Sequence, residues 1–187
     1  MFDDLLAAIY ALLALARMFF SERIVTDIFA LAEQVGHALK ARELMLAAAE
    51  SCTGGGIGEA VTMVPGSSAW FERGFITYTN TAKREMLGVK SETLDTDGAV
   101  SEQAVKEMVA GALANSHAQV AVAVSGVAGP AGGTPAKPVG TVWLAWALND
   151  CAPITETWRF PGDRAAVRRQ TVERALTGIL ELLRHYD

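Results

Sequence analysis

Residues 44–56 read LMLAAAESCTGGG, and this stretch decides the fold of the chain. Its first half, Leu44 to Ala49, is a short apolar run of the kind found in strands buried within a sheet. Polar residues and three glycines follow at once, and a helical pattern then continues to about Val64. A buried strand that enters a helix through a glycine-rich turn indicates an α/β fold, in which ligands bind outside the strand ends.

The flanking sequence supplies the other elements of such a fold. Further apolar or alternating runs predict strands at residues 74–78, 119–124, 140–148 and 154–160. Capping residues and helical spacing predict helices that begin near Thr26 or Asp27, Asn80, Ser101 and Asp163. The last two strands are expected to form an antiparallel hairpin. Together these elements predict a three-layer α/β/α sandwich with a mixed, mostly parallel sheet.

The beginning of the chain differs from the rest. Leu5 to Phe20 is strongly apolar, but two aspartates precede it and Arg17 interrupts it. It therefore fits neither a secretory signal nor a membrane span, which needs roughly 20 apolar residues. We expect residues 1–22 to form an extra helix that packs on the body or on a partner chain, beside a single domain over residues 23–187. A membrane anchor and a true start at Met18 remain as alternatives.

The composition of the chain argues against several classes of function. With 187 residues, 51% of them hydrophobic, the chain suits one folded domain with one sizeable core. Its net charge is -5 without a basic run, so non-specific binding to nucleic acid is not expected. The two cysteines lie far apart, and the three histidines lie outside any metal-binding motif. We therefore expect no disulfide scaffold, no metal, no cofactor and a reducing cytoplasmic location.

Ser51 is the first candidate for chemistry. It lies directly after the buried strand, where the N–H groups of the following helix could hold an oxyanion or a phosphate. The surrounding sequence completes neither a dinucleotide fingerprint, nor a phosphate-binding P-loop, nor the Gly-x-Ser-x-Gly elbow. Ser51 could equally be a helix cap, and Cys52 competes with it as a nucleophile because a thiolate at a helix start is reactive.

A serine nucleophile needs a base, and Lys83 is the best placed residue to provide one. It lies just past a predicted strand, five residues after Tyr78, whose hydroxyl could relay or orient a proton. A lysine acts as a base only when burial or nearby positive charge lowers its pKa from about 10.4. Read in isolation, the same segment also fits a solvated helix lysine beside a core tyrosine.

Two further segments could hold a ligand. The loop over residues 125–137 is rich in glycine and proline, which suits close approach of a flat ring or a phosphate. Arg164, near the start of the final helix, could pair with a phosphate through two N–H groups, although a plain surface arginine would look the same.

These segments together resemble the CinA C-terminal domain family, which includes stand-alone nicotinamide-nucleotide amidases. The resemblance is carried in order by AESCTGG (49–55), FERGFITYTN (71–80), Ala82 and Lys83, GAVS (98–101), SGVAGP (125–130), KPVGTV (137–142) and FPGDR (160–164). It spans about Thr26 to Leu183 and leaves out the first twenty or so residues. Ser125 stands where threonine is more common in the family, and the hydroxyl is retained.

The resemblance implies an activity and roles for residues. The activity is hydrolysis of nicotinamide mononucleotide to nicotinate mononucleotide and ammonia, without a metal. Ser51 would be the nucleophile, Lys83 the base and Tyr78 its partner. The residues implied to bind the substrate are Thr53, Gly54 and Gly55 through backbone N–H groups that hold the oxyanion, Asn80, Ser125 and Gly126 beside the ligand, and Arg164 at the phosphate.

Two other functions remain open on the sequence alone. One is a non-catalytic nucleotide-binding module linked to competence or damage-inducible functions, because a fold does not prove catalysis. The other is an amidase that acts on a different carboxamide or a lactam. In either case we expect a small-molecule ligand, no nucleic-acid or membrane partner, and a homo-oligomer, with a homodimer as the simplest form.

Overall fold

A computed structural model describes residues 28–185, and the expected helix over residues 1–22 lies outside them. Five strands in this part of the chain form one sheet in the order β2-β1-β3-β4-β5. Their bounds are β1 (Leu46–Glu50), β2 (Phe71–Ile76), β3 (Val120–Gly126), β4 (Thr141–Leu148) and β5 (Ile154–Arg159). The sheet is mixed, as the sequence predicts, but the expectation of mostly parallel pairing is only half met. β1 pairs in parallel with β2 and β3, whereas β4 runs antiparallel to both of its neighbours.

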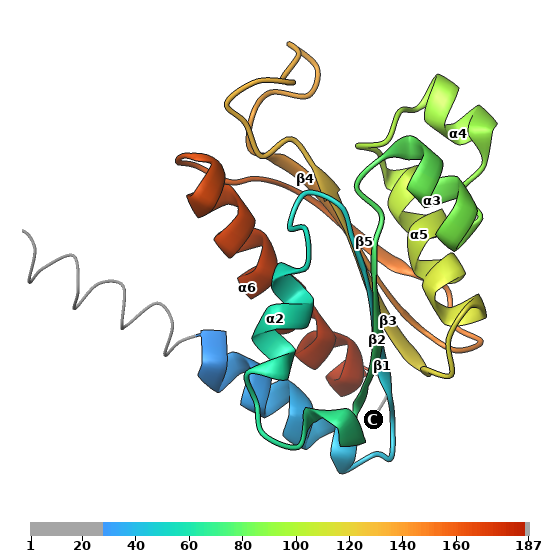
Figure 1. Cartoon of the computed structure of the whole chain (residues 1–187), viewed down its shortest axis with the longest axis vertical. Helices are drawn as coiled ribbons and strands as arrows, with labels where there is room; N and C mark the ends of the chain where they lie inside the picture. The colour runs from blue at the N-terminus through green and yellow to red at the C-terminus, as the bar shows by residue number, and fades with distance from the viewer. Residues whose placement is uncertain (1–27, 186–187) are drawn as a thin grey trace, which may run out of the picture.

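Helices cover both faces of the sheet (Figure 1). One face carries the helix over residues 28–40, α2 (Gly56–Thr62) and α6 (Arg164–His185); a short 3-10 helix, η1 (Ser67–Ala69), lies between α2 and β2 in the chain. The other face carries α3 (Asn80–Leu87), α4 (Ser91–Thr96) and α5 (Glu102–Ala114). The described part of the chain therefore has a helical layer on each side of its sheet.

The alternation of side chains along the strands divides the core in two. On β1, Leu46 and Ala48 belong to the cluster under α2 and α6, whereas Ala47 and Ala49 belong to the cluster under α5. Successive residues of a strand point to opposite faces, so a strand covered on both sides must be apolar throughout. This requirement explains the unbroken apolar run from Leu44 to Ala49.

Helix starts and ends follow the residues that the sequence marks. Ser101 accepts a hydrogen bond from the N–H of Ala104 at the start of α5, and Asp163 accepts one from Ala166 at the start of α6. These bonds satisfy N–H groups that have no partner within the helix. α3 ends at Gly88, whose φ of 67° lies in the left-handed region that glycine adopts without strain.

The parallel strands decide where a site can form. β2, β1 and β3 run in the same direction, so their carboxyl ends, and the loops that leave them, meet at one edge of the sheet. None of the helices within residues 28–185 combines the length and the apolar character needed to cross a bilayer.

Candidate active site

Ser51 lies at the end of β1, between the two strands that flank it. Its backbone N–H donates to the carbonyl of Val124 on β3, at 3.1 Å. On the other side, the carbonyl of Glu50 accepts the N–H of Thr77, the residue after β2, at 2.8 Å. The Ser51 side chain is therefore fixed at the common edge of three parallel strands, and only 8% of the residue is exposed.

The amine of Lys83 reaches this serine from α3. Its Nζ atom lies 2.9 Å from the Oγ atom of Ser51 and 2.8 Å from the carbonyl oxygen of Thr77. Three residues separate the end of β2 from α3, and the hydroxyl of the last of them, Thr79, caps the helix by accepting the N–H of Ala82. Lys83 lies one turn into this helix. The solvated-lysine alternative is wrong, because only 1% of Lys83 is exposed.

Burial changes the chemistry of this amine. Because its charged form is desolvated, the pKa of Lys83 falls from 10.5 to about 8. At pH 7 this raises the neutral fraction to about a tenth, roughly 300-fold more than an unperturbed lysine would have. A neutral amine at hydrogen-bond distance from a hydroxyl can accept its proton, so the pair has the geometry and the pKa of a nucleophile with its base.

Cys52 lies next to Ser51, but burial shifts the pKa of its thiol away from the reactive form. Burial raises the pKa of the Cys52 thiol to about 12. The thiolate, rather than the thiol, is the reactive form of cysteine. A thiol of this pKa stays protonated at neutral pH, so the electrostatics favour Ser51 over Cys52 as a nucleophile.

Glu50, the last residue of β1, is 1% exposed and has a role that was not predicted from the sequence. Its carboxylate lies at the start of α2, where Oε2 accepts the Thr53 hydroxyl at 2.6 Å and the N–H groups of Gly55 and Ile57 at 3.1 and 3.0 Å. Oε1 accepts the N–H of Gly58 at 2.9 Å. A charged residue that ends an apolar strand was the available signal, because buried charges need such partners.

These bonds correct the expected oxyanion donors. The N–H of Gly55 is engaged by Glu50, and the N–H of Gly54 donates to the carbonyl of Ser51 at 3.1 Å. Thr53 is fully buried, with its hydroxyl on Glu50 and its carbonyl on Arg168. The N–H groups of Gly54 and Gly55 are therefore already engaged, and none of the three residues is part of the lining of the cavity beside Ser51.

Tyr78 was predicted to be the partner of Lys83, but the hydrogen bonds of the two side chains go to other residues. The second hydrogen bond of the amine goes to the Thr77 carbonyl, and the Tyr78 hydroxyl instead accepts from Arg164 Nη2 at 2.6 Å. The reason is that neighbouring residues of an extended chain point to opposite sides. Thr77 is turned inward and fully buried, whereas Tyr78 is turned outward and is 56% exposed.

A cavity of about 250 Å³ unites most of the predicted residues. Its lining includes the Ser51–Lys83 pair together with other residues of the three loops, namely Ser51, Cys52, Tyr78, Asn80, Lys83, Ala99, Val100, Ser125, Gly126, Ala128 and Arg164. Arg164 is exposed at this cavity and is held by the carbonyl of Gly129 at 3.0 Å as well as by Tyr78. Within residues 28–185 no group of three or more His, Cys, Asp or Glu side chains is placed to hold a metal.

Ser125 and Gly126 both line the cavity, but neither offers it a free side-chain hydrogen-bond donor. The Ser125 hydroxyl donates to the carbonyl of Ala99 at 2.7 Å, so its oxygen faces the ligand only as an acceptor. Gly126 has no room for a side chain, because a Cβ atom would lie 2.6 Å from Val142 and 2.8 Å from the Thr141 carbonyl. Its role in the fold is thus to let β3 and β4 pair closely at the cavity floor.

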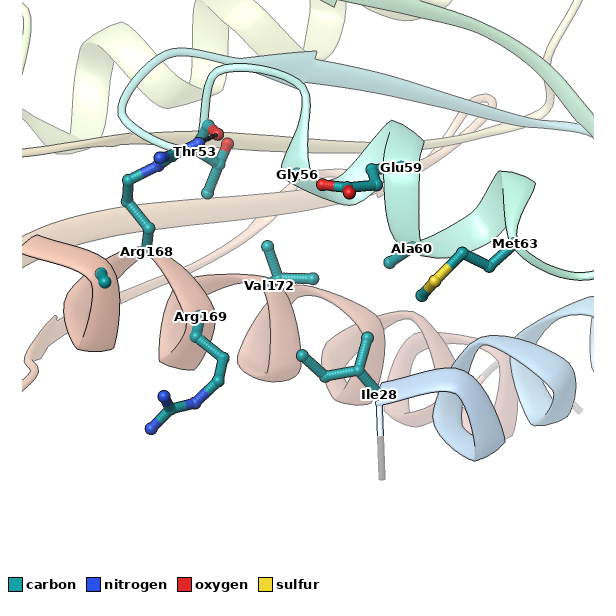
Figure 2. A pocket seen from close by; sticks show the side chains of 10 residues that line it. Ile28, Thr53, Gly56, Glu59, Ala60, Met63, Arg168, Arg169 and Val172 are labelled. Atoms are coloured by element: carbon teal, nitrogen blue, oxygen red, sulfur yellow. Dashed lines mark hydrogen bonds between the residues drawn. The ribbon is translucent and has the colours of Figure 1, made fainter. Parts of the chain in front are cut away.

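A second, larger cavity of about 300 Å³ lies between α2, α6 and the helix over residues 28–40 (Figure 2). Apolar side chains such as Ala60, Met63 and Val172 line it, and Thr53 and Arg168 close one end of it. Neither Ser51 nor Lys83 belongs to its lining, so it is separate from the cavity that holds the serine–lysine pair.

Comparisons with known proteins identify the family of the chain. The sequence profile described as CinA C-terminal domain matches residues 28–183. The nicotinamide-nucleotide amidohydrolase PncC of Pseudomonas putida is 57% identical over 152 residues, which cover 81% of this chain and 94% of that protein. PncC of Escherichia coli K12 is 54% identical over 151 residues, which cover 81% of this chain and 92% of that protein.

A solved structure shares the fold as well as the sequence pattern. The competence/damage inducible protein CihA from Agrobacterium tumefaciens aligns with a TM-score of 0.82 and 47% identity, covering 83% of this chain and 95% of that one.

Proposed function

Because the chain belongs to the CinA C-terminal domain family, we propose that it hydrolyses the carboxamide of nicotinamide mononucleotide with Ser51 as the nucleophile and Lys83 as the base. The reaction class rests on close homology to the nicotinamide-nucleotide amidohydrolases. The assignment of residues rests on one observation, the 2.9 Å contact between a buried amine and a hydroxyl at the end of β1.

The first half of the reaction forms an ester. Ser51 Oγ attacks the carboxamide carbon, and its proton passes to the neutral Nζ of Lys83. When the carbon–nitrogen bond breaks, the same proton moves from the Lys83 ammonium to the leaving nitrogen, which departs as ammonia. The amine thus serves first as base and then as acid, for which a pKa of about 8 suits both steps near neutral pH.

The second half releases the product. A water molecule attacks the ester carbon while Lys83 accepts one of its protons. The carbon–oxygen bond to Ser51 then breaks, and the proton returns to the serine oxygen as nicotinate mononucleotide leaves. The Thr77 carbonyl accepts from the amine at 2.8 Å and orients it towards Ser51 for both halves.

The developing oxyanion needs donors other than those of Gly54 and Gly55. We assign this role to the backbone N–H of Cys52, which adjoins the nucleophile in a residue that lines the cavity. In the free protein this N–H contacts the thiol of its own residue, a weak acceptor that a substrate oxyanion would displace. A donor of this kind is worth roughly a hundredfold or more in rate.

We assign to Arg164 the selection of a phosphorylated ligand. Its guanidinium stands at the cavity, oriented by Tyr78 and Gly129, and such a group binds phosphate through charge-assisted bonds. Asn80, which also lines the cavity, supplies a carboxamide that can bond to the ligand.

Ammonia release from nicotinamide mononucleotide, followed by a coupled assay, tests the proposal. The wild-type protein is expected to turn over the nucleotide, and Ser51→Ala to lose roughly a thousandfold or more in kcat while still binding it. A wild-type protein that binds the nucleotide but releases no ammonia would reduce the function to ligand binding. Turnover retained by Ser51→Ala would assign the attack to another group.

A further inference from the structure

The loop that carries the nucleophile is held from two opposite sides at Thr53. On one side the Thr53 hydroxyl donates to Glu50 Oε2 at 2.6 Å. On the other side the Thr53 carbonyl accepts from Nη2 of Arg168, 115 residues later in the chain, at 2.6 Å. Thr53 is fully buried, so water does not compete with either bond.

Thr53 lies two residues after Ser51, and the turn between them is closed by the hydrogen bond from the Gly54 N–H to the Ser51 carbonyl. A displacement of the Thr53 carbonyl therefore moves the backbone that carries the serine. From this geometry we propose that Arg168 is a positioning residue, which sets the Ser51 hydroxyl against the Lys83 amine by anchoring Thr53 and does not contact the substrate. The inference rests on the proposed function, since it concerns the rate of that reaction.

Packing alone does not account for an arginine here. The Nε atom of Arg168 is buried without a hydrogen-bond partner, an unfavourable state that an apolar side chain would avoid. What the arginine adds is the guanidinium contact with the nucleophile loop. Figure 2 shows its side chain extending from α6 towards Thr53 at the end of the second cavity.

The neighbouring residue provides a matched control. Arg169 follows on the same helix and also lines the second cavity, but its side chain points away from Thr53 (Figure 2). Its Nε atom lies 3.6 Å from the carboxylate of Glu173, one turn along α6. Both arginines carry the same charge and stem, and the Nε atom of each is buried without a hydrogen bond. They differ in their partners, because Arg168 contacts Thr53 whereas Arg169 lies beside Glu173.

The second cavity also allows a direct chemical test. Arg168→Ala removes the guanidinium from a site that opens into about 300 Å³ of space. A free guanidinium ion can enter there and donate to the Thr53 carbonyl in place of the missing side chain. Rescue of this kind would not repair a protein that had merely lost packing.

The experiment compares Arg168→Ala and Arg169→Ala with the wild type for turnover of nicotinamide mononucleotide, with and without guanidinium chloride well below denaturing concentrations. Sodium chloride at equal ionic strength and urea serve as controls. Arg168→Ala is expected to lose about 10- to 100-fold in kcat with KM within about threefold, because a small misplacement of reacting groups has effects of this size. Guanidinium, but neither control, is expected to restore at least about fivefold in kcat to this variant alone.

Two results would overturn the positioning role: a kcat for Arg168→Ala equal to that of Arg169→Ala, or a loss that guanidinium does not change. If Arg168→Ala fails to fold, Arg168→Met, which keeps an apolar stem and removes the donor, replaces it, and an unchanged kcat in that variant counts against the proposal. Failure of the proposed function looks different, because then the wild type releases no ammonia or Ser51→Ala still does.

Discussion

The Nζ atom of Lys83 lies 2.9 Å from the Oγ atom of Ser51, although 32 residues separate them in the chain. Parallel pairing of β1 with β2 creates this contact, because Ser51 and Thr77 follow strands that end at the same edge. The helix that begins after Thr79 then directs Lys83 back towards the serine. The same burial that makes the contact also lowers the pKa of the amine.

Cys52→Ala is expected to retain activity within about threefold of the wild type, because a thiol with a pKa of about 12 supplies no thiolate at neutral pH. Turnover of nicotinamide mononucleotide checks this, with Ser51→Ala as the inactive reference. The thiol should also resist iodoacetamide in the folded protein. A loss as large as that of Ser51→Ala would transfer the nucleophilic role to the cysteine.

The dependence of kcat/KM on pH should report the ionisation of Lys83. Only the neutral amine accepts the serine proton, and its fraction grows as pH rises towards the pKa of about 8. The rate is therefore expected to rise about tenfold per pH unit below that value and to level off above it. Steady-state rates between about pH 6 and pH 9.5 measure the profile. A flat or falling profile would contradict a lysine base.

The same pKa predicts a change of stability with pH. A lysine whose pKa is lower in the folded state than in the unfolded state destabilises the fold fully below the folded value, and this effect disappears above the unfolded value. With a shift from 10.5 to about 8, the wild type should gain about 2 kcal/mol relative to Lys83→Met between pH 7 and pH 10. Urea unfolding of both proteins at the two pH values measures the difference. An unchanged difference would mean that the amine is not desolvated.

Arg164→Ala is expected to weaken the selection for a phosphorylated substrate. Loss of a charge-assisted bond should lower kcat/KM for nicotinamide mononucleotide about 10- to 100-fold. Nicotinamide riboside, which lacks the phosphate, should be turned over at the same low rate by both proteins. Equal turnover of the two substrates by the wild type would show that Arg164 does not recognise phosphate.

The sequence predicts the central strands better than the edges. The runs that became β1 and β3 are apolar because helices cover both faces, so their positions were visible without a structure. The edge strand β2 begins at Phe71 rather than at Gly74, because its partly exposed side chains show little apolar pattern. α4 was not expected, since its six residues are too few to show a helical period.

Site residues could be predicted from the sequence where the residue type itself suggests a chemical role. Contacts made by backbone groups or between distant segments could not be predicted in this way. Ser51 and Lys83 stand out because a serine and a lysine follow neighbouring strands. The Thr77 carbonyl and the contact of Arg168 with Thr53 depend on long-range packing that no local pattern encodes. The homo-oligomer and the cytoplasmic location stay predictions.

Covalent labelling of Ser51 tests the central claim most directly. The wild-type protein is treated with a fluorophosphonate, which reacts with activated serines, and the labelled residue is identified by peptide mass spectrometry in parallel with Lys83→Met. We predict a single label on Ser51 in the wild type, a labelling rate that rises through about pH 8, and a rate at least about a hundredfold lower in Lys83→Met. Labelling of Ser51 at the same rate in both proteins would contradict activation of the serine by the lysine.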